Sequence, residues 1–120
     1  MTTHVYVDGS GKPKSTYGYY VKETGVAKHF RGSDLTNNQA EYLAIIEVLK
    51  DPILQKADSL IIYSDSQNTV KQLNHEYAIN DDALRELALQ AWDLISKSNV
   101  KIKIQWIPRK MNLAGKMLGS

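Results

Sequence analysis

Three carboxylates occupy positions in this sequence where a charged side chain needs compensation. Asp8 ends the alternating segment 4–8, and Asp65 directly follows the expected strand 60–64, which begins with the apolar run 60–63. Glu41 falls on the apolar arc of the segment 37–50 when residues are spaced by about 100°, as in an α-helix. Such positions are buried, and a buried carboxylate requires a hydrogen-bond donor, a basic side chain or a metal ion as its partner.

The three carboxylates can converge if the segments that carry them adopt the expected elements. A strand that follows a helix commonly runs parallel to an earlier strand, so Asp8 and Asp65 end at one edge of a sheet. Glu41 lies about one turn into its helix and can point toward that edge. Oxygen ligands suit Mg²⁺ or Mn²⁺, and two such ions about 3.5–4 Å apart promote phosphodiester hydrolysis. Taken singly, each acid could instead be a cap, a turn residue or a salt-bridge partner.

The rest of the chain supplies elements that fit this arrangement. We expect five strands and four helices: strands at 4–8, 16–22, 26–31, 60–64 and 100–107, and helices at 37–50, 66–75, 81–98 and 112–118. The first three strands form an antiparallel meander, because a Gly-containing turn joins the second to the third. Thr36 or Asn37 caps the first helix. The fold class is therefore α/β, with a mixed five-stranded sheet flanked by helices.

Bulk composition is typical of one globular domain spanning residues 1–120. The chain has no cysteine, which excludes disulfides and thiolate metal sites. It shows no signal peptide or membrane-length apolar run, so we expect a cytoplasmic protein without membrane contact. No acid follows Asp93, whereas six lysine and arginine residues do. This basic end could face a polyanion or form an ordinary solvated surface.

Three motifs carry a family resemblance that covers nearly the whole chain. The stretches VDGSG (7–11), TNNQAEYLAI (36–45) and YSDSQNTV (63–70) resemble ribonuclease H of type 1. The resemblance implies a ribonuclease H-like fold. It also implies that Asp8, Glu41 and Asp65 are catalytic carboxylates that bind two Mg²⁺ or Mn²⁺ ions.

The resemblance also implies a set of substrate contacts on an RNA/DNA hybrid. The amide side chains of Asn37, Asn38 and Gln67 would reach the minor groove. Gly9 and Ser10 would let the backbone approach the RNA strand, and Thr36 would contact a phosphate of the DNA strand. Arg109 or Lys110 could neutralise phosphate charge. Simple helix capping remains the alternative for Asn37 and Asn38.

Three departures separate this chain from the family pattern. The connection LNHEYAINDD (73–82) leaves no room for the basic protrusion of many members, and PRKMN (108–112) lacks their histidine. Gly115 stands after Ala114, where the family places a fourth acid. Asn112 is the nearest candidate for that role, because its amide oxygen can ligate Mg²⁺ without adding charge. Water at an empty position beside Gly115 is the alternative.

The expected function is an endoribonuclease that hydrolyses the RNA strand of RNA/DNA hybrids by a two-metal-ion mechanism. The alternative is a non-catalytic module that binds hybrid or double-stranded RNA through a decayed site. A related integrase or Holliday-junction nuclease fits less well, because Asn37, Asn38 and Gln67 would have no obvious task there. We expect a monomer by default.

Overall fold

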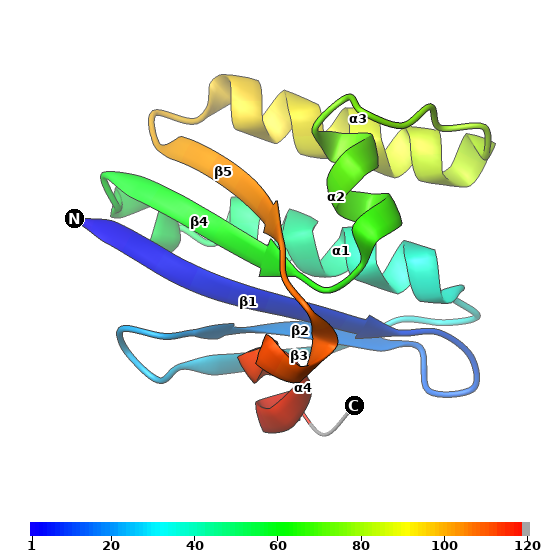
Figure 1. The fold of residues 1–120 in the computed structure, drawn as a ribbon, viewed down its shortest axis with the longest axis horizontal. Coiled ribbons are helices and arrows are strands. Elements are labelled where there is room, and N and C mark those ends of the chain that lie inside the picture. The colour runs from blue at the N-terminus through cyan, green and yellow to red at the C-terminus, as the bar shows by residue number, and fades with distance from the viewer. Residues whose placement is uncertain (119–120) are drawn as a thin grey trace.

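Five strands form one mixed sheet in the order β3-β2-β1-β4-β5 in the computed structural model, which describes residues 1–118 (Figure 1). The strands are β1 (Thr2–Ser10), β2 (Thr16–Val21), β3 (Ala27–Arg31), β4 (Ser59–Ser64) and β5 (Lys101–Trp106). β1, β2 and β3 pair antiparallel, whereas β4 runs parallel to both β1 and β5. The expected fold class and meander are thus confirmed.

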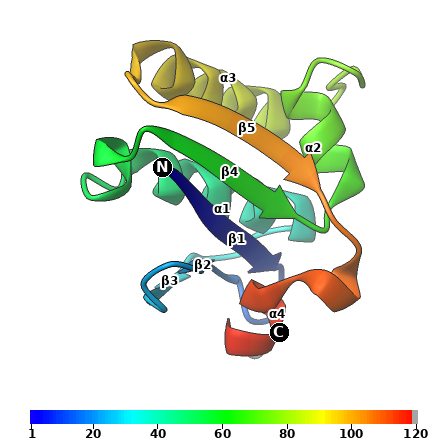
Figure 2. The ribbon, with the colours of Figure 1, turned by 60° about the vertical axis from the view of Figure 1, so that its left-hand side comes forward.

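Helices cover both faces of the sheet. They are α1 (Asn37–Lys50), α2 (Gln67–Leu73), α3 (Asp82–Lys97) and α4 (Leu113–Leu118), with short 3-10 turns η1 (Leu54–Lys56) and η2 (Arg109–Met111). α1 packs against β1, β2 and α3, while α4 lies on the other side against β1, β2 and β3 (Figures 1 and 2). Within residues 1–118, no helix combines the length and apolar character needed to cross a membrane.

The core lies between the sheet and α1. Val5 and Val7 of β1 and Ile62 of β4 are fully buried, and they belong to one hydrophobic cluster with Tyr42 and Ile45 of α1. The alternation of these strands turns every second side chain toward the face that α1 covers and the next one toward the opposite face. Asp8 and Asp65 continue the series of side chains that point away from α1, toward the face on which α4 packs.

α1 begins where the sequence predicts. The Thr36 hydroxyl accepts a hydrogen bond from the Gln39 N–H at 3.1 Å, and the Gln39 side chain accepts one from the Thr36 N–H at 2.9 Å. This reciprocal capping box fixes the first turn of the helix. Thr36 is thus the N-cap, and Asn37 is the first helical residue.

β1 continues two residues beyond its expected end. Gly9 and Ser10 still pair with β2, whereas the parallel pairing with β4 ends at Tyr6 and Tyr63. Asp8 therefore lies inside β1, at the point where β1 separates from β4. The gap that opens there is the place where the two strands present their carboxylates.

Candidate active site

Asp8, Glu41 and Asp65 converge at the edge where β1 and β4 separate. One carboxylate oxygen from each of the three residues lies within 4.8 Å of the other two. Asp8 and Asp65 follow the paired residues Tyr6 and Tyr63 at the same interval, so the parallel register sets them side by side. Glu41 reaches them from the second turn of α1.

Gly9 explains how α1 comes close enough to β1. A Cβ atom built on Gly9 would lie 2.4 Å from the carbonyl carbon of Ala40 and 2.6 Å from the Glu41 nitrogen. The Gly9 N–H also donates a hydrogen bond to Glu41 Oε1 at 3.1 Å. The backbone of β1 therefore touches the backbone of α1, and this contact places Glu41 beside Asp8.

We expect Gly9→Ala to lower stability by about 1–3 kcal/mol, because its methyl group would meet backbone atoms that cannot move aside. Denaturant unfolding measures this change. Gly32→Ala is the matched control, since its Cβ would meet only the mobile end of the Leu35 side chain, 2.6 Å away. Equal losses of stability in the two variants would show that the close β1–α1 contact tolerates an added methyl group as well as the Gly32 site does.

Burial and mutual repulsion raise the pKa of two of the three acids, and they keep Glu41 protonated near neutral pH. Burial, followed by the charges of Asp8 and Asp65, raises the pKa of Glu41 to about 8. Burial, followed by the charge of Asp65, raises the pKa of Asp8 to about 6, although Arg109 opposes this rise. The site thus contains more negative charge than its protein surroundings stabilise.

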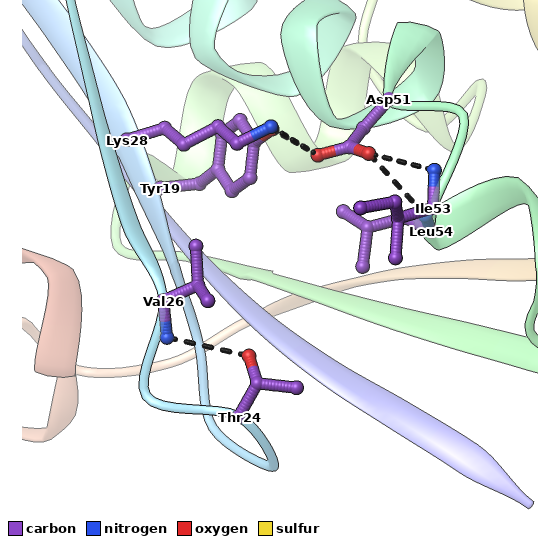
Figure 3. A network of polar contacts seen from close by, with 7 residues as sticks. All are labelled: Tyr19, Thr24, Val26, Lys28, Asp51, Ile53 and Leu54. Atoms are coloured by element: carbon purple, nitrogen blue, oxygen red, sulfur yellow. Dashed lines mark hydrogen bonds and ion pairs between the residues drawn. The ribbon is translucent and has the colours of Figure 1, made fainter.

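Asp51 shows how this protein compensates a buried acid when it uses only its own groups. Asp51 accepts hydrogen bonds from Lys28, from the Tyr19 hydroxyl and from the N–H groups of Ile53 and Leu54 (Figure 3). Burial alone would raise the pKa of Asp51, but these donors outweigh it and lower the pKa. Glu41 has only the Gly9 N–H and a long contact of 3.4 Å from the Ser64 hydroxyl.

The carboxylate cluster fits a hard divalent cation. Its donors are all oxygen atoms, they come from three separate elements, and their charge lacks a buried basic partner among the described residues. Mg²⁺ and Mn²⁺ favour such oxygen ligands. A cation bound among Asp8, Glu41 and Asp65 would supply the compensation that Lys28 and the backbone supply to Asp51.

Two hollows adjoin the cluster. The smaller, of about 170 Å³, is lined by Asp8, Asp65, Arg109, Asn112, Gly115 and Lys116. The larger, of about 320 Å³, is lined by Gly9, Ser10, Lys14, Asn37, Asn38, Glu41, Ser66 and Arg109. The larger hollow therefore brings five of the seven expected substrate residues together beside Glu41. Thr36 and Gln67 lie outside its lining.

The amide side chains on this surface have different surroundings. Asn37 Oδ1 accepts a hydrogen bond from the Gly11 N–H at 2.7 Å, which fastens the β1–β2 turn to the start of α1. Asn38 and Gln67 are exposed at the first turns of α1 and α2. The caps of these helices are Thr36 and Ser66. Neither Asn37 nor Asn38 is therefore the cap of α1. Asn37 has a structural role through its hydrogen bond with the Gly11 N–H.

The structure adds residues that the sequence did not indicate. The Trp106 indole N–H donates to the backbone carbonyl of Asp65 at 3.2 Å, and the Ser64 hydroxyl faces Glu41. Lys14 and Lys116 each line one hollow. Lys14 belongs to the turn after β1, and this position close in sequence to Asp8 could have suggested that Lys14 lies near the site. Nothing local in the sequence connects Trp106 with Asp65.

Asn112 lies at the cluster, but its amide oxygen is already engaged. Oδ1 accepts a hydrogen bond from the Ala114 N–H at 3.0 Å, and Nδ2 donates to Asp65 Oδ2 at 2.9 Å. The nitrogen, not the oxygen, faces the carboxylates. The expectation that the Asn112 oxygen ligates a metal ion is therefore not favoured by this geometry.

The sheet order, the antiparallel first three strands and the helices around them define the ribonuclease H-like fold. The chain belongs to the RNase H family, whose model matches residues 1–114. This membership confirms the family that the sequence motifs suggested, and it implies a nuclease of the hydrolase class.

Similar proteins agree with this assignment. RNase H1 from the halophilic archaeon Halobacterium salinarum NRC-1 has a TM-score of 0.85 at 27% identity, covering 98% of this chain and 94% of that one. The N-terminal RNase H domain of rv2228c from Mycobacterium tuberculosis has a TM-score of 0.76 at 25% identity, covering 93% and 86%. LC11-RNase H1, solved in complex with an RNA/DNA hybrid, has a TM-score of 0.83 at 20% identity, covering 97% and 92%, and supports the fold alone.

Among curated proteins, the bifunctional protein Rv2228c of Mycobacterium tuberculosis (strain ATCC 25618 / H37Rv) is 32% identical over 77 residues. The match covers 64% of this chain and 21% of that protein. An uncharacterized protein of Mycobacterium bovis, Mb2253c, matches to the same extent. The chain thus matches about a fifth of the length of these relatives.

Proposed function

We propose that this protein is a metal-dependent endoribonuclease that cuts the RNA strand of RNA/DNA hybrids. The observation that carries the proposal is the cluster of Asp8, Glu41 and Asp65. Its oxygen atoms converge within 4.8 Å without the donors that neutralise Asp51. Such a cluster destabilises the protein on its own, so its arrangement is explained by the ions that it would hold.

The protein's own groups have distinct tasks in this reaction. Asp8, Glu41 and Asp65 would hold the ions, and Trp106 fixes the backbone of Asp65. Bound divalent ions supply an activated water and positive charge beside the leaving oxygen. Cleavage by such a site leaves a 5′-phosphate and a 3′-hydroxyl. Arg109 lies close enough to Asp8 to lower its pKa, and can therefore attract a phosphate to the same edge.

The larger hollow, together with Gln67 next to its lining residue Ser66, supports a hybrid as the substrate. Exposed amides of Asn38 and Gln67 can hydrogen-bond to 2′-hydroxyls and base edges in a wide minor groove. Lys14 and Arg109 add positive charge for the phosphate backbone. LC11-RNase H1, which shares the fold, has been solved with an RNA/DNA hybrid bound.

The decisive experiment compares substrates under one set of conditions. The protein is incubated with Mg²⁺ or Mn²⁺ and end-labelled RNA/DNA hybrid, single-stranded RNA, duplex RNA or duplex DNA. We expect cleavage of the hybrid alone, with 5′-phosphate products, and complete loss of cleavage when EDTA is added. Equal cleavage of single-stranded RNA, or cleavage that survives EDTA, would contradict the proposal.

One observation favours a second candidate, a module that binds hybrids without cutting them. Gly115 lines the hollow beside Asp8 and Asp65 at the place of the family's fourth acid. Binding of the hybrid with submicromolar affinity, together with no product at any concentration of Mg²⁺ or Mn²⁺, would establish this alternative. The convergence of three acids beside the phosphate path argues against it, because those charges would repel a nucleic acid in the absence of ions.

Substitution of the exposed amides tests the substrate assignment. We expect Asn38→Ala and Gln67→Ala each to raise KM for the hybrid severalfold while changing kcat less, because both side chains would contact the substrate and neither belongs to the carboxylate cluster. Gln90→Ala, an exposed amide on α3, is the matched control and should leave KM unchanged. An unaltered KM in both variants would remove these residues from the substrate surface.

A further inference from the structure

The side chain of Asn112 joins three segments of the chain at the carboxylate cluster. It is 1% exposed, which is unusual for a polar side chain. Its Nδ2 donates to the Val7 carbonyl and to Asp65 Oδ2, both at 2.9 Å, while its Oδ1 accepts from the Ala114 N–H at 3.0 Å. Asn112 thus ties β1 and the end of β4 to the first turn of α4.

The chemistry of the partners determines which way the amide faces. The Val7 carbonyl and the Asp65 carboxylate only accept hydrogen bonds, whereas the Ala114 N–H only donates. A flipped amide would direct its oxygen at two acceptors and its nitrogen at a donor, which would break all three bonds. The observed orientation is therefore the one that satisfies every group.

This arrangement restrains Asp65 against the repulsion of its neighbours. When they are ionised, Asp8 and Glu41 push the Asp65 carboxylate toward solvent, since like charges in close contact repel. The amide of Asn112 holds one oxygen of Asp65, and Trp106 holds its backbone carbonyl. The other oxygen of Asp65 accepts no hydrogen bond from the described residues, and one Asp65 oxygen lies within 4.8 Å of oxygens of Asp8 and Glu41. A ligand that is ordered in advance binds a cation without a further loss of side-chain entropy.

We propose that Asn112 is a positioning residue that holds Asp65 in its metal-binding orientation, and is not itself a metal ligand. The inference rests on the proposed metal-dependent function of the same site. It assigns to Asn112 the role that outer partners of metal ligands commonly have, and loss of such a partner typically weakens metal binding or activity by about 10–100-fold.

Asn112→Ser separates positioning from helix capping. Serine retains an oxygen that can cap α4 but lacks the two N–H donors for Val7 and Asp65. We expect the Kd for Mn²⁺, measured by titration calorimetry, to rise about tenfold or more. Cleavage at low Mn²⁺ should fall and recover at high Mn²⁺, while KM for the hybrid stays unchanged. Asp81→Ser exchanges the cap of α3 in the same way and should leave the Kd unaltered. A Kd for Asn112→Ser within twofold of wild type would reduce Asn112 to a cap and overturn the proposal.

NMR of the side-chain amide distinguishes positioning from metal ligation. The NH₂ signals of Asn112 are identified by their loss in the Asn112→Ser spectrum. We expect both protons to stay protected from exchange in protein saturated with Mg²⁺, because the amide continues to hold Val7 and Asp65. Rapid exchange of these protons on addition of Mg²⁺ would mean that the amide turns its oxygen to the ion, and would overturn the proposal.

These measurements also separate the inference from the proposed function. A wild-type protein that leaves hybrids intact but binds Mn²⁺ more tightly than Asn112→Ser would refute the nuclease and retain the positioning role. A wild-type protein that cuts hybrids, and whose Mn²⁺ affinity is unchanged by Asn112→Ser, would support the nuclease and refute the positioning role. A wild-type protein that binds no Mn²⁺ at all would overturn both.

Discussion

Asp65→Asn is expected to abolish hybrid cleavage and to leave the fold intact. The substitution retains an oxygen that can accept the Asn112 hydrogen bond, but it removes one charge from the three-carboxylate cluster. We expect a loss of about a thousandfold or more, equivalent to about 4 kcal/mol of transition-state stabilisation. Initial rates with hybrid at saturating Mn²⁺ measure the loss, and circular dichroism checks the fold.

Asp58→Asn provides the control for this change. Asp58 is an exposed acid that precedes the opposite end of β4, where it pairs with the N-terminal amine. The same substitution there should leave cleavage within about twofold of wild type, as is usual for surface changes away from a site. Cleavage by Asp65→Asn at close to the wild-type rate would refute the three-carboxylate site.

The fold could be predicted from the sequence because its signals are local and mutually consistent. Alternation marks β1, and the capping pattern from Thr36 to Gln39 marks the start of α1. What remained hidden depends on partners that are distant in the chain. The extension of β1 to Ser10 is set by pairing with β2, and η1 and η2 are single turns with no periodicity to detect.

The site could also be predicted in part: its three carboxylates could be foreseen from the sequence, but its hydrogen bonds could not. Asp8, Glu41 and Asp65 stand out because each is an acid where the apolar pattern requires burial, and the structure brings them together. The orientation of Asn112 could not be foreseen, because it depends on Val7, which is 105 residues away. Sequence motifs indicate which residue types reach the site. The hydrogen bonds that distinguish a ligand from a support are formed only in the folded chain.

Glu41→Gln is expected to stabilise the metal-free protein at neutral pH. Glu41 is 7% exposed, and burial together with Asp8 and Asp65 raises its pKa from 4.5 to about 8. Glutamine resembles the protonated acid in shape. It can still accept the Gly9 N–H and pair with the Ser64 hydroxyl. The variant therefore retains the packing of Glu41 without its tendency to ionise.

The pH dependence follows from the direction of the shift. Below the unfolded pKa of 4.5, Glu41 is protonated in both states, so wild type and variant should be about equally stable. As the pH rises toward 8, the unfolded chain releases this proton and the folded protein retains it, so wild type loses stability that the variant keeps. Each pKa unit corresponds to about 1.4 kcal/mol, so we expect an advantage of a few kcal/mol at pH 8.

Urea unfolding in EDTA at pH 4 and pH 8 measures this difference, and Mn²⁺ should reverse it. A cation that binds the wild-type cluster stabilises the folded state by mass action. Glu41→Gln has lost one ligand and should gain much less stability from Mn²⁺. Glu47→Gln, on the same helix, removes a surface pairing with Lys50 and should show neither effect. If Glu41→Gln is instead destabilised at pH 8 in EDTA, the Glu41 carboxylate is well compensated by the protein alone. The physical basis for a cation at this site would then be lost.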